Sequence, residues 1–383
     1  MFKSDYYGAP EILSPEDGMH YFFGYYDMRA CSEGRHLTLR VPFMDRLPEA
    51  EDEAEIGYLK DRQFFPVAKT TAWNFQQAAM LQWHPFEKDT IYYNAFLDGK
   101  CVAVTHHILT GAKKYAEMPA ACISPCGRWG LSVNFGRIYD FRPGYGYAGC
   151  PDPFSRIDRP EEDGVFLLDM ESGKAKLLFN YQEIGEKSGF APNEKILVNH
   201  ITFDPTSRRF CMLVRNFIKE NGAWGTSLMM GDLKGNLKTV LKKTYVSHYI
   251  WQDATHLIAH CTVEGEEKLM ARIDMEKETF EKWDMPYFHR SGNGDIHCNI
   301  LPGGKYVIGD GYPKDGYRCL MAYQIETGEE RELFRCKTDI PQSIDVRCDL
   351  HARFINDGKE ISFDTTMNGM RQIAKISAAA LDF

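Results

Sequence analysis

Hydrophobic positions along this chain occur in short runs separated by polar turns, and the arrangement repeats over the whole sequence. Each repeat is an apolar run, a turn rich in Gly, Pro, Asn, Asp or Ser, and a second apolar run, which predicts paired strands. Seven such turns can be recognised, at residues 32–35, 85–89, 124–128, 204–208, 252–255, 302–305 and 356–359. The second strands are expected at residues 36–41, 90–94, 129–134, 210–214, 256–261, 306–309 and 360–363.

A third run usually follows, at residues 164–169, 227–231, 268–274, 319–324 and 371–376. Seven repeats in 383 residues give a spacing of about 55 residues, slightly longer than a usual propeller blade. We therefore predict an all-β chain whose residues 1–383 form a single seven-bladed β-propeller of four-stranded antiparallel blades. The competing interpretation is a sandwich of unrelated hairpins.

Two irregular stretches, near residues 42–72 and 138–162, are too long for plain hairpin loops. We interpret both as insertions that overhang the mouth of the propeller, because long loops on a rigid scaffold commonly carry function.

The amino-acid composition narrows the range of functions that the chain could have. The formal net charge of −9 argues against a surface that follows nucleic-acid phosphates, and the content of 44% hydrophobic and 26% charged residues argues against disorder. No apolar run approaches the roughly 18 to 20 residues of a membrane-spanning helix. Eleven cysteines without a repeating spacing, and a polar N-terminus, predict a cytoplasmic protein with reduced thiols, although removal of a signal peptide would leave the same pattern.

Four histidines fall at equivalent places in consecutive repeats: His200, His248, His297 and His351. Each precedes the first turn of its repeat by four or five residues, near the start of the innermost strand, so all four imidazoles should face one rim. A single buried histidine is often only a core residue, but histidine also suits proton transfer and metal binding at neutral pH.

The last two repeats add a carboxylate and a thiol. His297, Asp310, Cys348 and His351 could together hold a divalent metal, with Zn²⁺ as the first expectation and Mn²⁺ or Ca²⁺ as alternatives. The spacing is not that of a zinc finger, so a buried cysteine beside two hydrogen-bonded histidines is the alternative.

Positive charge is expected at the same rim. Arg215 follows the second strand of the repeat that carries His200, and Arg137 follows Asn134 in the third repeat, close to Tyr145. An arginine at a strand end is commonly solvated, but beside several imidazoles it is a candidate clamp for a carboxylate.

The segments Gly294-Asp295-Ile296-His297, Val307-Ile308-Gly309-Asp310-Gly311 and Asp349-Leu350-His351-Ala352-Arg353-Phe354 resemble those of the seven-bladed propeller polysaccharide lyases. Oligogalacturonate lyases and ulvan lyases are the families in question, and both cleave uronic-acid glycosides by β-elimination. The resemblance is clearest over the last two blades, weaker over residues 74–260 and slight at the N-terminus.

This resemblance implies roles for several side chains. Arg215 would neutralise the sugar carboxylate with help from Arg137. His200 or His248 would be the base, and Tyr145 or Tyr249 would protonate the leaving oxygen. The metal would be close to the substrate, as in oligogalacturonate lyases, or structural, as in ulvan lyases.

The chain departs from the ulvan lyases in its second blade. Gln77 and Asn94 stand where those enzymes have histidines, and an amide cannot act as a general base near neutrality. We expect these amides, with Asn134 and Arg137, to contribute to substrate binding, which leaves proton transfer to the fourth and fifth blades.

The sequence thus predicts a lyase for acidic oligosaccharides, with no nucleic-acid or membrane partner and an open oligomeric state. The alternative is a non-catalytic propeller that binds a carbohydrate or a protein, with a structural metal. A hydrolase with paired carboxylates is less favoured because no acidic pair recurs at the predicted rim.

Overall fold

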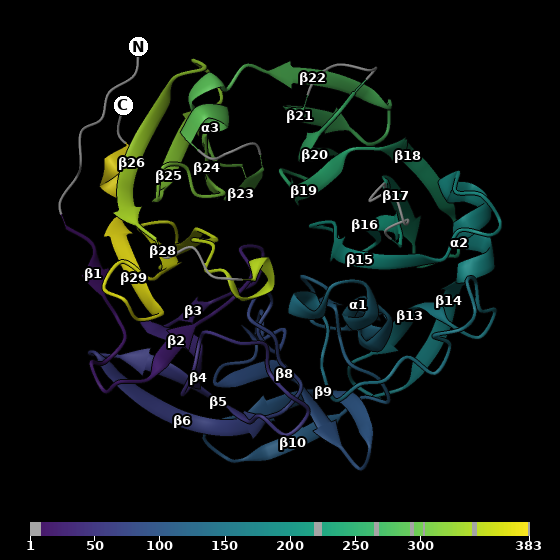
Figure 1. The fold of residues 1–383 in the computed structure, drawn as a ribbon, viewed down its shortest axis with the longest axis horizontal. Helices are drawn as coiled ribbons and strands as arrows, with labels where there is room; N and C mark the ends of the chain where they lie inside the picture. The colour runs from purple at the N-terminus through teal and green to yellow at the C-terminus, as the bar shows by residue number, and fades with distance from the viewer. Residues whose placement is uncertain are drawn as a thin grey trace.

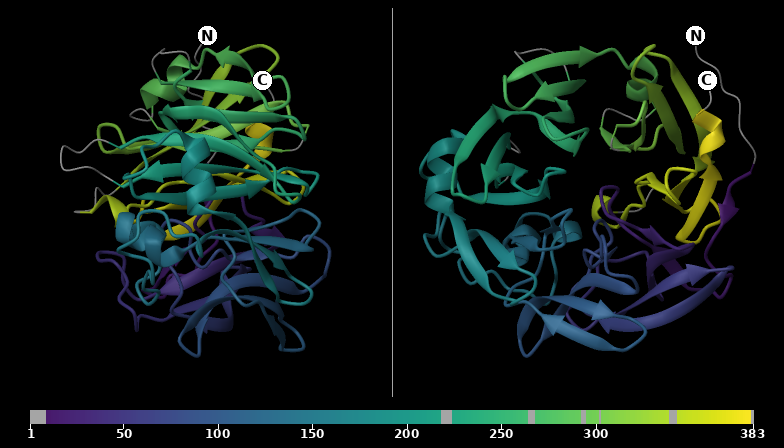
Figure 2. Two further views of the ribbon diagram at one scale, coloured as in Figure 1. Left: turned by 90° about the vertical axis from the view of Figure 1, so that its right-hand side faces the viewer. Right: turned by 180° about the vertical axis from the view of Figure 1, so that it is seen from behind.

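Seven separate antiparallel sheets surround a central channel in the computed structural model, which describes residues 9–217, 224–263, 268–291, 295–301, 303–338 and 343–381. Figure 1 shows the sheets following one another around the ring in chain order, and Figure 2 shows the ring edge-on and from behind. The prediction of a seven-bladed β-propeller with four-stranded antiparallel blades is confirmed.

The first three blades, from the inner strand outward, are as follows. Blade 1 has β2 (His20–Phe22), β4 (Arg35–Val41), β5 (Ala54–Lys60) and β6 (Gln63–Thr70), with the short β3 (Cys31–Ser32) paired to β4. Blade 2 has β7 (Gln82–Trp83), β8 (Thr90–Leu97), β9 (Lys100–His107) and β10 (Ala112–Tyr115). Blade 3 has β11 (Cys122–Ile123), β12 (Trp129–Ser132), β13 (Gly164–Asp169) and β14 (Ala175–Asn180).

The remaining blades follow the same order. Blade 4 has β15 (Ile196–Phe203), β16 (Arg209–Asn216), β17 (Thr226–Asp232) and β18 (Leu237–Thr244), and blade 5 has β19 (Val246–Trp251), β20 (His256–Cys261), β21 (Leu269–Asp274) and β22 (Thr279–Trp283). Blade 6 has β23 (Ile296–Ile300), β24 (Tyr306–Gly311), β25 (Tyr317–Gln324) and β26 (Glu330–Lys337). Blade 7 has β27 (Arg353–Ile355), β28 (Glu360–Thr365), β29 (Gln372–Ser377) and β1 (Glu11–Ile12).

Both ends of the chain build the seventh blade. β1 pairs with β29 through Glu11 opposite Lys375 and Ile12 opposite Ala374, and Figure 1 shows the purple N-terminal strand beside the yellow C-terminal ones. This pairing closes the ring and covers the outer edge of β29, which another strand could otherwise join.

Apolar strands in the middle of each blade are buried between neighbouring blades. In β16, Cys211 and Leu213 pack in one cluster with Tyr249 and Leu257 of blade 5. Outer strands are polar by contrast, and every residue of β10 is exposed. The core of the molecule is therefore a set of layers between blades, which holds the inner strands and their side chains in fixed positions.

The short helices lie in connections between strands. They are α1 (Phe135–Phe141), η1 (Pro143–Tyr145), α2 (Tyr181–Ser188), α3 (Pro286–Ser291), η2 (Ile344–Val346) and η3 (Ala378–Leu381). α1 and η1 belong to a long connection from β12 to β13 that includes the segment 138–162. A disulfide between Cys101 of β9 and Cys150 ties this connection to blade 2, so the expectation of reduced thiols is wrong for this pair.

The expectation of an insertion at 42–72 is wrong for most of that stretch. Residues 54–60 and 63–70 form β5 and β6, the two outer strands of blade 1. β6 is largely exposed and contains Pro66, which favours a loop in the sequence but which an outermost strand tolerates. Within the described residues, no helix has the length and apolar character that crossing a bilayer requires.

Candidate active site

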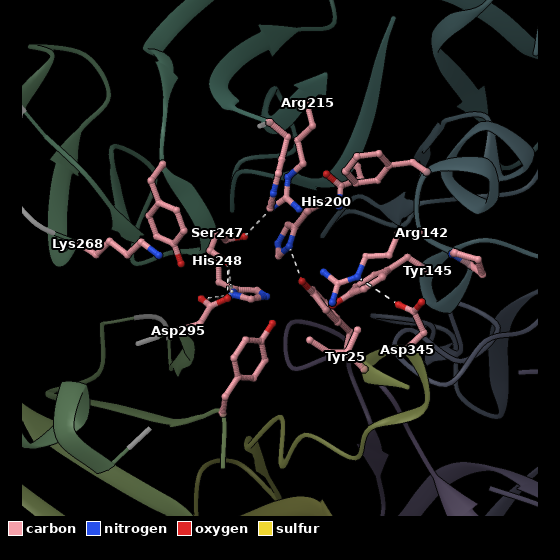
Figure 3. Close-up of a pocket in the computed structure, with 17 residues that line it drawn as sticks. Tyr25, Arg142, Tyr145, His200, Arg215, Ser247, His248, Lys268, Asp295 and Asp345 are labelled. Atoms are coloured by element: carbon pink, nitrogen blue, oxygen red, sulfur yellow. Dashed lines mark hydrogen bonds and ion pairs between the residues drawn. The ribbon is translucent and has the colours of Figure 1, made fainter. Parts of the chain in front are cut away.

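A cavity of about 590 Å³ lies among the inner strands of the ring and the insertion from blade 3 (Figure 3). Aromatic, cationic and imidazole side chains predominate in its wall. The lining residues are Tyr25, Phe141, Arg142, Pro143, Tyr145, Asn199, His200, Arg215, Trp224, Tyr245, Ser247, His248, Lys268, Asp295, Tyr312, Ile344 and Asp345.

The four histidines predicted to share a rim lie together. Ring centroids are 6.3 Å apart for His200 and His248, 4.4 Å for His248 and His297, and 4.6 Å for His297 and His351. Tyr26 packs against all four, at centroid distances of 5.7 to 6.4 Å. The histidines at equivalent positions in four blades therefore all pack against the same tyrosine.

His200 lies at an irregularity in β15, where the pairing with β16 shifts between Asn199 and Ile201. Its φ of 50° is a left-handed backbone conformation that a non-glycine residue adopts at an energetic cost. The Tyr25 hydroxyl is 2.6 Å from His200 Nδ1, and burial holds the pKa of His200 well below its usual range. His200 is thus a neutral imidazole paired with a phenol in the cavity wall.

His248 forms a dyad with Asp295. His248 Nδ1 is 2.9 Å from Asp295 Oδ1, and the Ser247 hydroxyl donates to Asp295 Oδ2 at 2.6 Å. Because a carboxylate accepts, Nδ1 carries the proton and Nε2 keeps its lone pair. Burial lowers the pKa of His248 to about 4, against the opposing effect of Asp295, so the ring is neutral near pH 7.

Arg215 is a buried cation that the carboxylate of Asp295 stabilises only from beyond ion-pair distance. Its Nη2 reaches only the carbonyls of Val246 and Ser247, at 3.5 and 3.4 Å, and its Nε has no hydrogen-bond partner. No carboxylate in the described part of the chain forms an ion pair with it, and burial lowers its pKa. The guanidinium instead lies 4.8 Å from the centre of the Trp224 ring.

The insertion from blade 3 reaches the cavity opposite Lys268 (Figure 3). Arg142 Nε is 3.2 Å from Asp345 Oδ1, which joins the insertion to η2 of blade 7. The Tyr145 hydroxyl lines the cavity and accepts a hydrogen bond of 2.9 Å from Arg347 Nη2. Of the predicted catalytic residues, His200, His248, Arg215 and Tyr145 therefore line one cavity.

The predicted metal ligands are only partly brought together. His297 and His351 lie with Asp349, and one ligand atom from each of these three lies within 4.8 Å of the others. Asp310 accepts hydrogen bonds from the backbone of Leu350 and His351, at 2.9 and 3.0 Å, so it braces the ligand segment. Cys348 donates to the carbonyl of Asp349, and burial raises its pKa to about 11, so it is a neutral core thiol.

This group fits a divalent cation. His351 Nδ1 donates to the carbonyl of Gly24 at 2.8 Å, and Nε2 of both His297 and His351 has no hydrogen-bond partner. Asp349 Oδ2 is 3.9 Å from His297 Nε2 and 3.7 Å from His351 Nε2. For His351 this orientation, with Nδ1 held and Nε2 free, is the usual one of metal-binding histidine. His297 makes no hydrogen bond of good geometry through either ring nitrogen, and its Nδ1 faces Asp310 Oδ1 at 3.4 Å.

Two guanidiniums share the Asp349 carboxylate. Arg318 Nη2 lies 2.6 Å from Oδ1 and Arg347 Nε lies 2.7 Å from Oδ2, and they hold the pKa of Asp349 well below its usual range despite burial. Neither oxygen receives a hydrogen bond of good geometry from the described residues. Because two guanidiniums already neutralise the Asp349 carboxylate, the two imidazoles are the better metal ligands. Asp349 is the acidic member of the group, and the sequence prediction missed it.

Several predicted substrate-binding residues have structural roles instead. Arg137 is fully buried and holds the insertion through Asp152 and the carbonyls of Phe154, Ile157, Asp158 and Ile196. Asn134 caps α1 by accepting from Arg137 N, and donates to Asp152 and Asp163. Neither side chain reaches the cavity, because the insertion folds over both.

Two further expectations, for Asn94 and Tyr249, are also wrong. Asn94 is fully buried and donates to the Ala120 carbonyl and to the Tyr147 hydroxyl. Gln77 lines a smaller cavity that has Tyr25 and His200 in common with the first one, so its role in substrate binding stays a prediction. Tyr249 is fully buried and its hydroxyl donates to the carbonyls of His200 and Cys211, so it supports the strand of His200 and touches no substrate.

The sequence also contained signals for residues that were missed. Asp295-Ile296-His297 and Asp349-Leu350-His351 repeat an acid two residues before a histidine, and each acid approaches the histidine of the preceding blade. Tyr25 and Tyr26 precede the first turn of blade 1 much as the histidines precede theirs. By contrast, nothing in the local sequence distinguishes Lys268 or Trp224 from surface residues.

Fold and cavity together define a seven-bladed β-propeller with a histidine-lined pocket among its inner strands. Its fold is similar to that of oligogalacturonate lyase from Vibrio parahaemolyticus, with a TM-score of 0.64, 12% identity and coverage of 96% of this chain and 92% of that chain. A structure of oligogalacturonate lyase in complex with manganese gives a TM-score of 0.64, 13% identity and coverage of 98% of each chain. The resemblance predicted from the sequence is thus confirmed at the level of the fold.

The fold is also shared with other proteins. The tricorn protease matches with a TM-score of 0.56 and 11% identity over 98% of this chain, but only 35% of that chain is covered. No protein-family model matches the sequence, and no curated protein does so either. Because folds host many activities, function has to be argued from the site.

Proposed function

We propose that this protein is a lyase that cleaves acidic oligosaccharides containing uronic acid by β-elimination. The observation that carries the proposal is Arg215, a buried guanidinium in the cavity without a carboxylate partner among the described residues. A buried charge is costly unless an anion pairs with it, and guanidinium binds carboxylate in a bidentate manner. The carboxylate of a uronic acid would meet this need.

Elimination moves one proton and one electron pair. The C5 proton leaves, the C5 electron pair forms the C4=C5 double bond, and the C4–O bond breaks. Negative charge spreads onto the carboxylate as the C5–H bond weakens, and the guanidinium of Arg215 would stabilise that charge where it develops.

His248 is the better candidate for the base. It is neutral because burial lowers its pKa to about 4, and Asp295 fixes its Nδ1 proton, which leaves Nε2 as the basic nitrogen. His200 is less suited, because its Nδ1 is engaged by Tyr25 and its Nε2 is buried without a partner.

The leaving oxygen requires a proton. Tyr25 lines the cavity, and burial raises its pKa well above the usual range, so the phenol retains its proton at neutral pH. We assign the donor role to Tyr25 with His200 behind it. Tyr145 remains the second candidate, although its hydroxyl already accepts from Arg347.

A divalent cation would be held by His297 and His351, with Asp349 as the acidic ligand. When bound, it would supply a second positive charge for the substrate carboxylate. The similar oligogalacturonate lyase structure contains manganese, and the absence of Cys348 from the group removes the main argument for Zn²⁺ over Mn²⁺.

Metal binding can be measured directly by calorimetric titration of the metal-free protein with Mn²⁺ and with Zn²⁺. We expect one site per chain, which His297→Ala and His351→Ala each abolish. His107→Ala, in blade 2, is the matched control and should bind as the wild type does. Equal binding by all three variants would show that the cation lies elsewhere.

The activity is tested by mass spectrometry of oligouronide digests. Elimination gives products whose masses sum to that of the substrate, one of them unsaturated, whereas hydrolysis adds one water. We expect His248→Asn to lower turnover by about 10²- to 10⁴-fold, as for loss of a general base. His256→Asn, in the same blade but outside the cavity, should retain activity.

Two results would oppose this function. Hydrolysed products would indicate a different chemistry. Binding of acidic oligosaccharides without any product would favour the non-catalytic propeller, in which the same cavity serves only to bind a carbohydrate.

A further inference from the structure

Trp224 differs from the other tryptophans of the chain in its surroundings. It is 44% exposed and lines the cavity, whereas Trp73, Trp83, Trp251 and Trp283 are buried. Its ring lies 4.8 Å from the Arg215 guanidinium and 6.0 Å from the Phe141 ring, at an interplanar angle of 68°. An aromatic side chain that is held from two sides, yet remains open to a pocket, is a preorganised contact surface.

The two residues that hold Trp224 come from different parts of the fold. Arg215 ends β16 of blade 4, and Phe141 ends α1 in the insertion of blade 3. The indole therefore contacts both Arg215, which would bind the substrate carboxylate, and Phe141 of the insertion. Anything bound against it lies directly beside the group held by Arg215.

We propose that Trp224 is the stacking platform for the sugar residue adjacent to the one that reacts, and that it supplies much of the additional affinity for a chain of two sugars over a single uronic acid. The proposal rests on the proposed function. One face of a pyranose presents C–H groups, which lose contact with water favourably when they pack on an aromatic ring. Its hydroxyl groups remain directed to the sides, toward solvent and polar side chains.

A positive charge on the side of the cavity opposite Arg142 supports an extended acidic ligand. Lys268 Nζ lies 4.0 Å from the centre of the Tyr245 ring and forms no ion pair within the described residues. Figure 3 places Lys268 and Arg142 on opposite sides of the cavity, with His200, Arg215 and His248 between them. The lining thus continues in both directions beyond the residues that would carry the chemistry.

A purely structural role for Trp224 predicts a different outcome. If the indole only oriented Arg215, its removal would weaken binding of a single uronic acid and of an oligouronide by the same factor. A platform for the neighbouring sugar affects only the longer ligand. Ligand length therefore distinguishes the two roles.

The experiment titrates His248→Asn protein, which should bind without turnover, with a monouronide and with the di- and trisaccharides of the same acid. Intrinsic tryptophan fluorescence reports contact with Trp224, and calorimetry gives the affinity. We expect the disaccharide to change the fluorescence, and Trp224→Ala to weaken disaccharide binding roughly tenfold while monouronide binding changes less than twofold. Trp224→Phe should retain most of the affinity but lose the fluorescence response.

Trp129→Phe is the matched control, since Trp129 lies on β12 and does not line the cavity. Melting temperatures exclude misfolding as a cause. Equal weakening for both ligand lengths, or unchanged disaccharide affinity in Trp224→Ala, overturns the platform while the lyase function stands. If the parent protein neither binds nor cleaves any oligouronide, the proposed function itself fails, and the platform fails with it.

Discussion

Asp27 shows how strongly burial shifts the pKa of an individual side chain near the histidines. Its side chain is only 17% exposed, and Oδ2 is 3.9 Å from His200 Nε2. Burial raises the pKa of this carboxyl to about 7, far above the ordinary value of 3.8. A folded state that keeps Asp27 protonated gains stability at low pH, and loses it as the pH rises from 3.8 through 7.

Asp27→Asn should therefore remove this dependence, because asparagine imitates the neutral acid. We expect the unfolding free energy of the variant, relative to wild type, to increase between pH 4 and pH 7 by at most about 1.4 kcal/mol per pH unit, and to level off above pH 7. The buried histidines that lie away from Asp27 titrate alike in both proteins, so the difference cancels their contribution. Urea unfolding at pH 4.5, 6 and 8 measures it, and a difference that is independent of pH would contradict a raised pKa.

At the residue scale, the sequence could predict which histidines converge, because their position before the first turn repeats from blade to blade. The sequence could not predict that an insertion would bury side chains expected at the same rim. Asn134 and Arg137 follow β12 as expected, yet they begin α1, and the chain that follows folds back over them and forms hydrogen bonds with both side chains. Position along a strand determines which rim a side chain approaches, but not what covers it.

At the scale of elements, the connection from β12 to β13 is the part of the fold that most directly shapes the cavity. Gly136 of α1 packs so closely against the backbone of Cys150 and Asp152 that a Cβ there would lie 2.3 Å from the Cys150 carbonyl oxygen. Phe141 and Tyr145, further along the same segment, line the cavity. The disulfide therefore anchors the segment that forms one wall of the site.

Cys150→Ser should lower the melting temperature by roughly 5 °C, since the bridge closes a loop of 49 residues, for which chain entropy gives about 4 kcal/mol. Treatment of the wild type with a dithiol reductant, which converts the bridge to two thiols, should produce the same shift. Differential scanning calorimetry measures both, with Cys126→Ser as control because Cys126 is an exposed free thiol. Identical melting of oxidised and reduced wild type would count against the bridge.

The strands themselves were predictable where turns are strongly marked. The second strand of every blade follows its turn as expected, because Gly, Pro, Asp and Asn identify turns by a backbone mechanism. β5 and β6 are not marked in this way. β6 is mostly exposed and interrupted by Pro66. β5 buries Ile56 and Leu59, but it follows an acidic stretch and has no clear turn before it.

At the scale of the whole molecule, the ring depends on a very short strand. β1 contributes two residues, and without it β29 would present an open edge. Such edges favour aggregation and loosen the last blade.

A chain that begins at Leu13 should therefore melt several degrees lower and aggregate more readily on heating than a chain that begins at Ala9. The second chain retains β1 and is the matched control. Thermal unfolding with light scattering measures both effects, and equal melting would show that blade 7 is stable with three strands.

The net charge of the whole molecule does not describe the charge at the cavity. The net charge of −9 describes the average surface, whereas Arg215 and Lys268 supply positive charge at one place. This local charge is compatible with the proposed acidic sugar, whereas the average surface would repel an extended polyanion.

The segment that follows β2 in blade 1 connects the last blade of the ring to the candidate site. The Gly24 carbonyl accepts from His351 of blade 7, Phe23 and Gly24 donate to Asp364, and Tyr25 contacts both His200 and His351. Residues separated by 327 to 341 positions in the sequence thus meet at the same few atoms. A chain that ends within blade 7 before Asp364 would lack both the strand pairing with β1 and the carboxylate that holds Phe23 and Gly24, so the cavity residue Tyr25 would lose the support next to it although the other lining residues are still present.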